Sequence, residues 1–220
     1  MRNFLYATLA FVALAPLAHA ESAQNLDAEL AAVQSAWAVA NYDTPAGNAR
    51  VQAFEALSRR TQTLVEVFPS RPEPLVWHGI VLSTYAGAKG GLGALGLAKQ
   101  SRAALEGALK LDPNALQGSA YTSLGTLYYK VPGFPLGFGN KGKAREFLQH
   151  ALTLNPDGID PNFFYGEFLF EQDEYAPALE HLQKALRAPP RPGRETADSG
   201  RRKEIEALIA KLQEKTGRAG

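Results

Sequence analysis

The segment with the strongest chemical signature covers residues 135–144 and reads PLGFGNKGKA. Its glycines follow the spacing Gly137-x-Gly139-x-x-Gly142, which is typical of a turn that binds a dinucleotide, and Lys143 comes next. Read from Gly137, the same segment gives G-x-x-x-x-G-K, one residue short of a phosphate-binding loop. These residue types raise the hypothesis of nucleotide chemistry.

The surroundings of this segment argue against that hypothesis. A phosphate-binding loop requires a strand before it and a Ser or Thr after the lysine to hold Mg²⁺. Here a tyrosine-rich, helical pattern precedes it, and Ala144 follows the lysine. Residues 91–96 repeat the glycine spacing, so glycine-rich segments produce it readily. We therefore predict no nucleotide and no cofactor. A weaker alternative is an anion attracted by Lys141, Lys143 and the amides of the following helix.

Other catalytic and metal-binding patterns are missing from the sequence. Beyond residue 20 the only histidines are His78, His150 and His181, and none forms a pair with metal-ligand spacing. Serines and carboxylates show neither a nucleophile elbow nor a paired-acid arrangement. We predict that the protein is not an enzyme and has no metal site, and that His78 is a hydrogen-bonded core imidazole.

The first 20 residues, MRNFLYATLAFVALAPLAHA, have the pattern of a secretory signal peptide. Arg2 supplies a positive charge, residues 4–14 are apolar, and Ala18-x-Ala20 is a small-x-small cleavage site. The apolar run is shorter than the roughly 20 residues that span a bilayer. We predict cleavage after Ala20 and a periplasmic location. The alternative is that the segment stays as a membrane anchor.

Composition limits the function of the remaining 200 residues, which suffice for one domain. Without Arg2, 22 basic residues balance 22 acidic ones, which argues against a nucleic-acid-binding protein. The chain has no cysteine, so disulfides, thiolate metal sites and a lipid-modified cysteine are excluded. We expect an exported, soluble protein stabilised by packing alone.

Apolar residues recur at helical spacing, as at Leu26, Leu30 and Val33, which predicts an all-α fold. Residues 21–70 are predicted to form an N-terminal helical pair, with helices near residues 25–42 and 47–68. Residues 191–220 are predicted to be a linker and a C-terminal helix. The linker is expected over 188–200, and the helix, with one apolar stripe, is expected to cap the preceding elements. The alternative is a partner-binding helix.

Between residues 71 and 190 the sequence repeats itself three times. Each unit ends in a helix with small, large and small residues at the same spacings before a closing proline. An earlier helix in each unit carries a glycine, at Gly79, Gly125 and Gly166, where a side chain would push the partner helix away. The sets are Ser101, Leu105, Ala108 and Pro113, then Ala144, Leu148, Ala151 and Pro156, and finally Ala178, Leu182, Ala185 and Pro190.

Tyr121-x-x-Leu124-Gly125-x-x-Tyr128 resembles the first half of the tetratricopeptide repeat, and the other units are looser copies. The resemblance implies an α-solenoid of helical hairpins. In the first two units the glycine and the ladder lie farther apart than in the third, so we predict long glycine-rich connectors at 85–100 and 128–143.

Helices that come first in such units line a concave groove, which implies a set of binding positions. Transferring these positions gives Val76, Ile80 and Thr84 in the first unit, Thr122, Thr126 and Tyr129 in the second, Phe163, Glu167 and Phe170 in the third, and Phe134 and Phe138 from the connector closing one end. This groove would be apolar and aromatic with few charges.

The whole pattern, and residues 124–156 most distinctively, resembles the T-component family associated with TRAP (tripartite ATP-independent periplasmic) transporters. The resemblance implies ligand handling or protein association in the periplasm. Our leading hypothesis is a non-catalytic scaffold or adaptor for another protein, such as a transport component. The alternative is a carrier that holds a small hydrophobic molecule in the aromatic groove.

Overall fold

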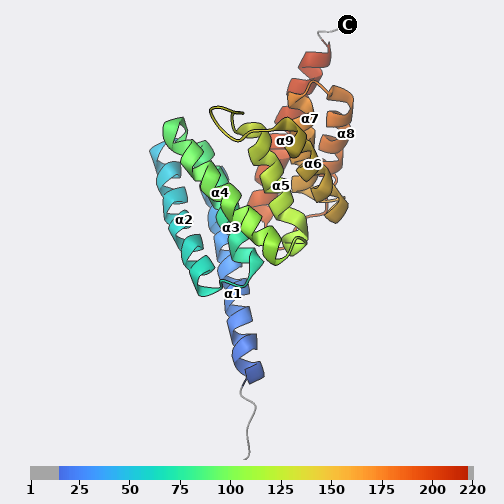
Figure 1. The fold of residues 1–220 in the computed structure, drawn as a ribbon. Helices are drawn as coiled ribbons and strands as arrows, with labels where there is room; N and C mark the ends of the chain where they lie inside the picture. Colours follow the sequence, from blue (N-terminus) through green and yellow to red (C-terminus); the bar gives the residue numbers. More distant parts are fainter. Residues whose placement is uncertain (1–14, 218–220) are drawn as a thin grey trace, which may run out of the picture.

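The computed structural model describes residues 15–217, with the side chains of 15–24 and 92 left aside, and within that range it is helical without a β-strand (Figure 1). The predicted all-α class is confirmed. The elements are α1 (Ala15–Ala38), the π-helical turn η1 (Val39–Asp43), α2 (Asn48–Val67), α3 (Pro72–Lys89), α4 (Gly91–Leu111), α5 (Ala115–Lys130), α6 (Lys141–Leu154), α7 (Ile159–Glu171), α8 (Tyr175–Leu186) and α9 (Glu195–Gly217). Most of the predicted signal peptide, residues 1–14, lies outside the described residues.

The three predicted repeats are the hairpins α3/α4, α5/α6 and α7/α8, and each is held by a glycine facing a leucine. A Cβ added to Gly125 would lie 2.6 Å from Cγ of Leu148. The corresponding distances are 2.5 Å from Gly79 to Leu105 and 2.9 Å from Gly166 to Leu182. The three leucines are fully buried. The packing role predicted for these glycines is confirmed, because no larger residue fits between the paired helices.

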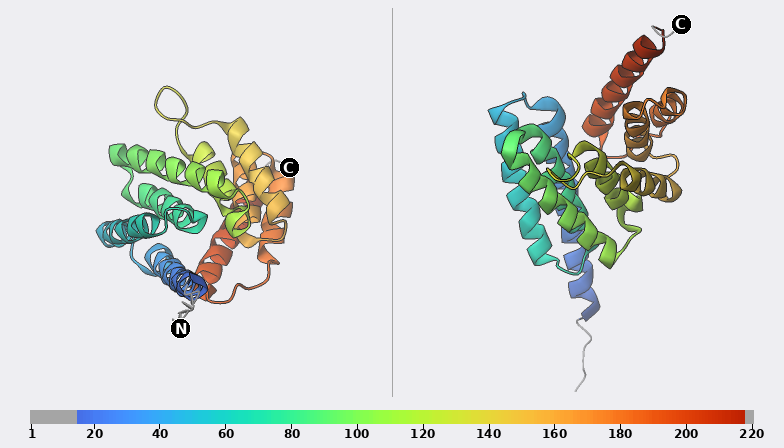
Figure 2. Two further views of the ribbon diagram at one scale, coloured as in Figure 1. Left: turned by 60° about the horizontal axis from the view of Figure 1, so that its bottom comes forward. Right: turned by 45° about the horizontal axis from the view of Figure 1, so that its top comes forward.

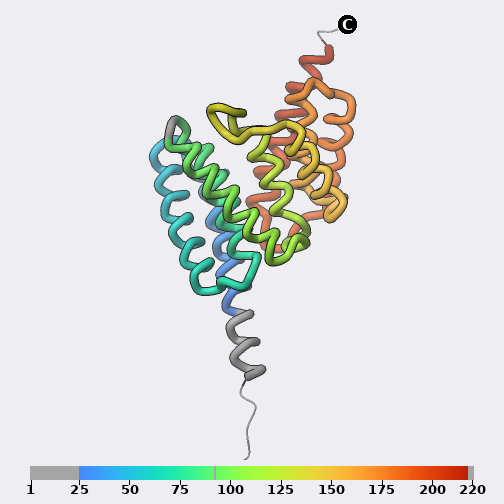
Figure 3. Tube along the Cα trace, in the orientation of Figure 1, coloured from blue at the N-terminus to red at the C-terminus, as the bar shows by residue number. Residues whose placement is uncertain are grey.

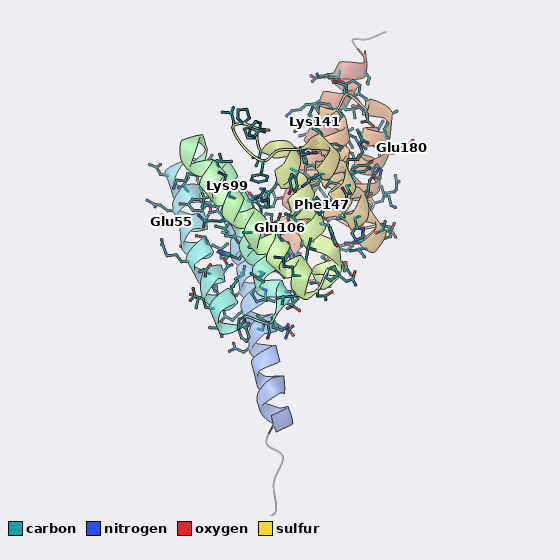
Figure 4. The ribbon with its side chains drawn as sticks, viewed as in Figure 1. Glu55, Lys99, Glu106, Lys141, Phe147 and Glu180 are labelled. Atoms are coloured by element: carbon teal, nitrogen blue, oxygen red, sulfur yellow. The ribbon has the colours of Figure 1, made fainter. Side chains whose placement is uncertain are left out.

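The helices follow one another around a ring rather than along an open arc. Seen from the end in Figure 2 (left), the chain turns from α1 through the hairpins until α9 lies beside α1, and the trace in Figure 3 follows the same path. Helix α9 contacts α7 and α8 on one side and α1 and η1 on the other. Figure 4 labels four exposed side chains on these helices, namely Glu55 on α2, Lys99 and Glu106 on α4, and Glu180 on α8. The C-terminal helix thus covers the last hairpin, as expected, and also closes the ring.

The first predicted connector, residues 85–100, is wrong. Helices α3 and α4 run through this stretch and are separated by Gly90 alone. Gly90 and Gly91 both have φ of +61°, a left-handed conformation that glycine adopts without strain, and this allows the sharp reversal. The other glycines of this stretch remain helical, because the extensive packing of α3 against α4 outweighs the low helix propensity of glycine. The hairpin is longer, while its connection is short.

The second predicted connector is present but shorter than predicted, and it covers residues 131–140 between α5 and α6.

The C-terminal helix also differs from expectation, because α9 begins at Glu195, inside the stretch predicted to be a linker. Asp198, within that stretch, accepts a hydrogen bond from the Arg191 amide over 2.9 Å and ties the beginning of α9 to the preceding loop. The predicted N-terminal pair corresponds to α1 with η1, and α2.

Candidate functional site

The glycines that suggested a nucleotide serve the fold of the α5/α6 loop. A Cβ on Gly137 would lie 2.4 Å from the carbonyl oxygen of Pro132, and one on Gly139 would lie 1.9 Å from that of Val131. The Gly139 amide donates to the Pro132 carbonyl oxygen over 2.9 Å. These positions require glycine because the loop folds back on its own backbone.

The start of α6 is capped by the chain itself. The Lys143 amide donates to Oδ1 of Asn140 over 2.9 Å, which satisfies one of the free amides at this helix end. Lys143 Nζ lies 5.5 Å from the ring centre of Tyr128. Within residues 15–217 no strand runs into this loop. The residues that resembled a phosphate-binding loop are therefore accounted for by capping and loop packing.

The main candidate site is a cavity of about 980 Å³ on the inner side of the ring. Helices α1 to α5, α7 and α9 all contribute to its walls, together with the loop after α5. The walls are mainly apolar. The apolar side chains are Trp37, Phe54, Ala86, Ala88, Ala94, Leu95, Ala98, Leu127, Val131, Pro132, Leu136, Phe163, Phe164, Ala207 and Leu208.

A second cavity, of about 400 Å³, adjoins the first. Six residues line both, namely Trp37, Ser83, Thr84, Thr126, Phe164 and Arg201. Its walls are more polar and include hydroxyls, three arginines and Asp160. Part of its wall is a left-handed turn at the beginning of α5, where Leu116 and Gln117 have φ of 48° and 54°. Such strained conformations in residues other than glycine are concentrated at functional sites.

The structure brings six of the predicted groove residues to these cavities. Phe163 and Glu167 line the larger one, Ile80 and Thr122 line the smaller one, and Thr84 and Thr126 line both. Phe163 is only 5% exposed, so its ring combines core packing with one wall of the cavity. Whether these residues bind a ligand stays a prediction.

The structure does not place the other five at either cavity. Val76 is fully buried in the core. Phe170 packs against Tyr175, with 5.8 Å between the ring centres. Phe134 is 94% exposed, and Phe138 packs against Tyr128 instead of closing the groove. The connector does reach the larger cavity, but through Pro132 and Leu136.

Tyr129 reaches the site indirectly, by holding Glu167. Its hydroxyl donates to Oε2 of Glu167 over 2.5 Å, and Lys130 Nζ donates to Oε1 over 2.9 Å. Burial, reinforced by the negative charge of Glu167, raises the pKa of Tyr129 well above its usual value. The Tyr129 hydroxyl thus stays protonated and available as a donor. The pair fixes Glu167 at the cavity wall.

The residues that sequence reasoning missed come from the loop before α9 and from α9 itself. Arg191 and Arg201 enclose Asp160, which lies in the first turn of α7. Arg191 Nη1 lies 2.6 Å from its Oδ2 and Arg201 Nε lies 3.0 Å from its Oδ1. Arg201 also contacts Glu204 over 2.6 Å, and its guanidinium carbon lies 4.4 Å from the ring centre of Phe163. Clustered arginines and acids in residues 188–204 were the available signal, but residues 188–200 were predicted to be a linker and the residues after them a capping helix.

The ion cluster of Asp160, Arg191, Arg201 and Glu204 is stabilised by the mutual attraction of its charges. Burial would raise the pKa of Asp160, but the charges of Arg201 and Arg191 outweigh it and lower that pKa to about 2. Burial acts to lower the pKa of Arg201, and the charge of Asp160 more than compensates, so the pKa is raised overall. Asp160 therefore remains ionised near neutral pH and joins α7 to α9.

In the described part of the chain, His78 and His181 each contact a polar side chain, whereas His150 is exposed. His78 Nδ1 lies 2.8 Å from the Thr61 hydroxyl, and burial lowers the His78 pKa. The predicted hydrogen bond is present, but the imidazole is half-buried instead of lying fully in the core. Among residues whose side chains are described, no group of three or more His, Asp or Glu is placed to hold a metal ion.

Across the described helices, none has both the length and the apolar character needed to cross a membrane.

No family model matches the chain, and no curated protein matches it in sequence. Solved structures do resemble its fold. The crystal structure of TTC0263, a thermophilic TPR protein in Thermus thermophilus, has a TM-score of 0.56 at 16% identity, covering 85% of this chain and 98% of that one. Two crystal structures of MamA have TM-scores of 0.44 and 0.42 at 20% and 21% identity, covering 76% and 75% of this chain and 91% and 84% of theirs. The likeness to TTC0263 shows that the protein has a TPR-like all-α fold.

Proposed function

We propose that this protein is a non-catalytic binding protein and that the cavity inside the ring receives a small, mostly apolar ligand. The observation that carries the proposal is the position of α9, which contacts α1 and η1 and converts a concave groove into a cavity. The TPR-like fold supplies a concave surface that suits binding.

The cavity has the properties of a ligand site. Its volume of about 980 Å³ lies at the upper end of the range for small-molecule pockets, roughly 300–1,000 Å³. The small side chains of Ala94 and Ala98 leave space at one wall of the cavity, while Phe163 and Phe164 form bulky apolar walls. Such a surface favours an apolar ligand because burying apolar area from water is favourable.

Native mass spectrometry of protein purified from its own host tests this proposal. We expect a retained small molecule that organic extraction releases. Ala207→Trp should weaken retention, because Ala207 lines the cavity and is exposed, so the indole would narrow the cavity without disturbing the core. Ala210→Trp is the matched control, since Ala210 is exposed on the same helix but does not line the cavity. Retention by both variants alike would contradict the proposal.

A second candidate function, a scaffold or adaptor for another protein, is favoured by the α5/α6 loop. Phe134 is 94% exposed and Leu136 is 74% exposed, although large apolar side chains are usually buried. In this function the loop docks on a partner. The test compares proteins crosslinked to the wild type and to Phe134→Ser in the native host. A partner recovered equally with both would contradict docking through this loop.

Export to the periplasm and association with a transport component complete the proposal. Support comes from the signal-peptide pattern of residues 1–20 and from the resemblance of residues 124–156 to the T-component family. Amino-terminal sequencing of the protein from a periplasmic fraction tests export, with Glu21 expected as the first residue. A chain that keeps residues 1–20 would contradict cleavage.

A further inference from the structure

The loop between α5 and α6 holds apolar side chains in water. Phe134 is 94% exposed and Leu136 is 74% exposed, and Pro135 between them is exposed as well. We call residues 134–136 the apolar tip. In Figure 2 (left) the loop stands out from the ring of helices, so the tip lies away from the core. Large apolar side chains gathered at one exposed point indicate a surface that a partner buries.

The contacts of the loop itself keep the tip in this position. The amides of Leu136 and Gly137 both donate to the Gly133 carbonyl oxygen, each over 3.1 Å. Behind the tip, the ring of Phe138 packs edge-on against that of Tyr128 on α5, with 5.6 Å between the ring centres. The loop therefore anchors one aromatic ring on the body of the protein and presents the other to solvent. The turn that carries the tip is formed without a partner.

Basic side chains flank the loop, although the chain after residue 20 is neutral overall. Residues 74–105, from the α3/α4 hairpin, and residues 113–145, which include the loop, contain no acidic residue. Three basic side chains of these stretches pair with acids from elsewhere. Among the described side chains, the exposed lysines of these stretches without an ion-pair partner are Lys89, Lys99, Lys141 and Lys143. Figure 4 shows Lys99 and Lys141 on the two sides of the loop.

The tip lies at the mouth of the larger cavity. Leu136 lines this cavity although most of its side chain is exposed. Other exposed wall residues are Gly87 and Gly91, beside the α3/α4 turn, and Lys211 on α9. Since exposed wall residues mark where a cavity meets solvent, the mouth lies between this turn, the loop and α9. A surface that buries the tip would therefore face the entrance of the cavity.

We propose that the apolar tip inserts into the surface of a membrane that contains anionic lipids, and that the larger cavity exchanges its apolar ligand with this membrane. The inference rests on the proposed ligand-binding function and names the source of the ligand. Phe134 and Leu136 leave water at the boundary between head groups and acyl chains, while the four lysines are attracted by anionic head groups. A lipid surface explains the tip, the lysines and the neighbouring apolar cavity together. A protein partner leaves the position beside the cavity without a role.

Co-sedimentation with vesicles tests the inference on protein purified from its own host. We expect binding to vesicles of phosphatidylcholine and phosphatidylglycerol in equal amounts, and binding weaker by roughly tenfold or more to phosphatidylcholine alone. Phe134→Ser should weaken binding to the anionic vesicles roughly tenfold or more, because the apolar ring that leaves water is lost. Leu111→Ser is the matched control, since Leu111 is 46% exposed at the opposite end of α4 from Gly91 and should not affect binding. Equal binding by the wild type and Phe134→Ser would overturn the inference.

Phe134→Trp reports insertion directly, because the native Trp37 and Trp77 are both buried. Its emission should shift to the blue with anionic vesicles, whereas that of Leu111→Trp should not. A shift with a partner protein from the host, but not with vesicles, would overturn the lipid assignment and support the adaptor function. A wild type that retains its small molecule but binds no vesicles would overturn this inference and leave the proposed function standing. One that binds vesicles through the tip but retains no small molecule would overturn the proposed function and leave the insertion standing.

Discussion

At the scale of single residues, the fold depends on a glycine placed opposite a leucine in each hairpin. The leucine side chain is fully buried and its branch point, Cγ, occupies the space that a Cβ would need. A substitution there must displace a packed side chain or separate two helices, and both cost free energy. Gly96, also within a helix, has no such neighbour.

Gly125→Ala should lower the free energy of unfolding by about 1–3 kcal/mol, because the new methyl group would lie 2.6 Å from Cγ of Leu148. Gly96→Ala is the matched control. Gly96 lies in α4 with nothing within 4 Å of a Cβ, so alanine should raise the free energy of unfolding by up to about 1 kcal/mol. Chemical denaturation measures both. Equal effects of the two substitutions would refute the packing role of Gly125.

Asp160 is the residue whose ionisation should matter most in acid. Its folded pKa of about 2 lies below the ordinary value of 3.8, so its contribution to stability is complete above about pH 4 and is lost as pH falls toward 2. The contribution is up to about 2 kcal/mol. In Asp160→Asn the free energy of unfolding should be lower at neutral pH and change less between pH 4 and 2. An unchanged pH slope in this variant would contradict the ion cluster's role.

At the scale of secondary-structure elements, the hairpins could be predicted because their signal is local. Gly125 and Leu148 belong to adjacent helices, and the same ladder occurs three times. The connector at 85–100 could not be predicted from glycine content, since packing between α3 and α4 decides its conformation. Only Gly90 and Gly91, with their positive φ, needed to be glycine for the turn.

The cavity walls were predictable only in part, for a related reason. Thr84, Thr126 and Phe163 follow from repeat positions on the first helices of the units. The contributions of α9 depend on long-range ion pairs, such as that of Arg201 with Asp160, which no periodic pattern reveals. A short polar stretch rich in Pro and Gly resembles a linker in sequence, although here its Arg191 pairs with Asp160 of α7 and with the buried Asp198.

At the scale of the whole molecule, the proposed binding function depends on closure of the ring. Closure occurs where α9 crosses η1, and there Gly200 faces the ring of Tyr42. The Tyr42 hydroxyl donates to Glu204 over 3.2 Å, and its ring packs edge-on against Trp37 with 5.8 Å between centres. These contacts join the two ends of the described chain and place Trp37 and Glu204 in the larger cavity wall.

Gly200→Ala should open this closure, because the added Cβ would lie 2.4 Å from Cγ and Cδ1 of Tyr42, a rigid ring. Overpacking of about 1–3 kcal/mol would speed amide hydrogen exchange in η1 and the first turns of α9 roughly tenfold or more, without affecting α5 and α6. The small molecule that we expect the wild type to retain should be held more weakly, since the cavity loses a wall. Ser199→Ala, at the neighbouring exposed position, should change neither measurement. Exchange that stays slow in η1 and α9 of Gly200→Ala would show that the ring closes without this contact.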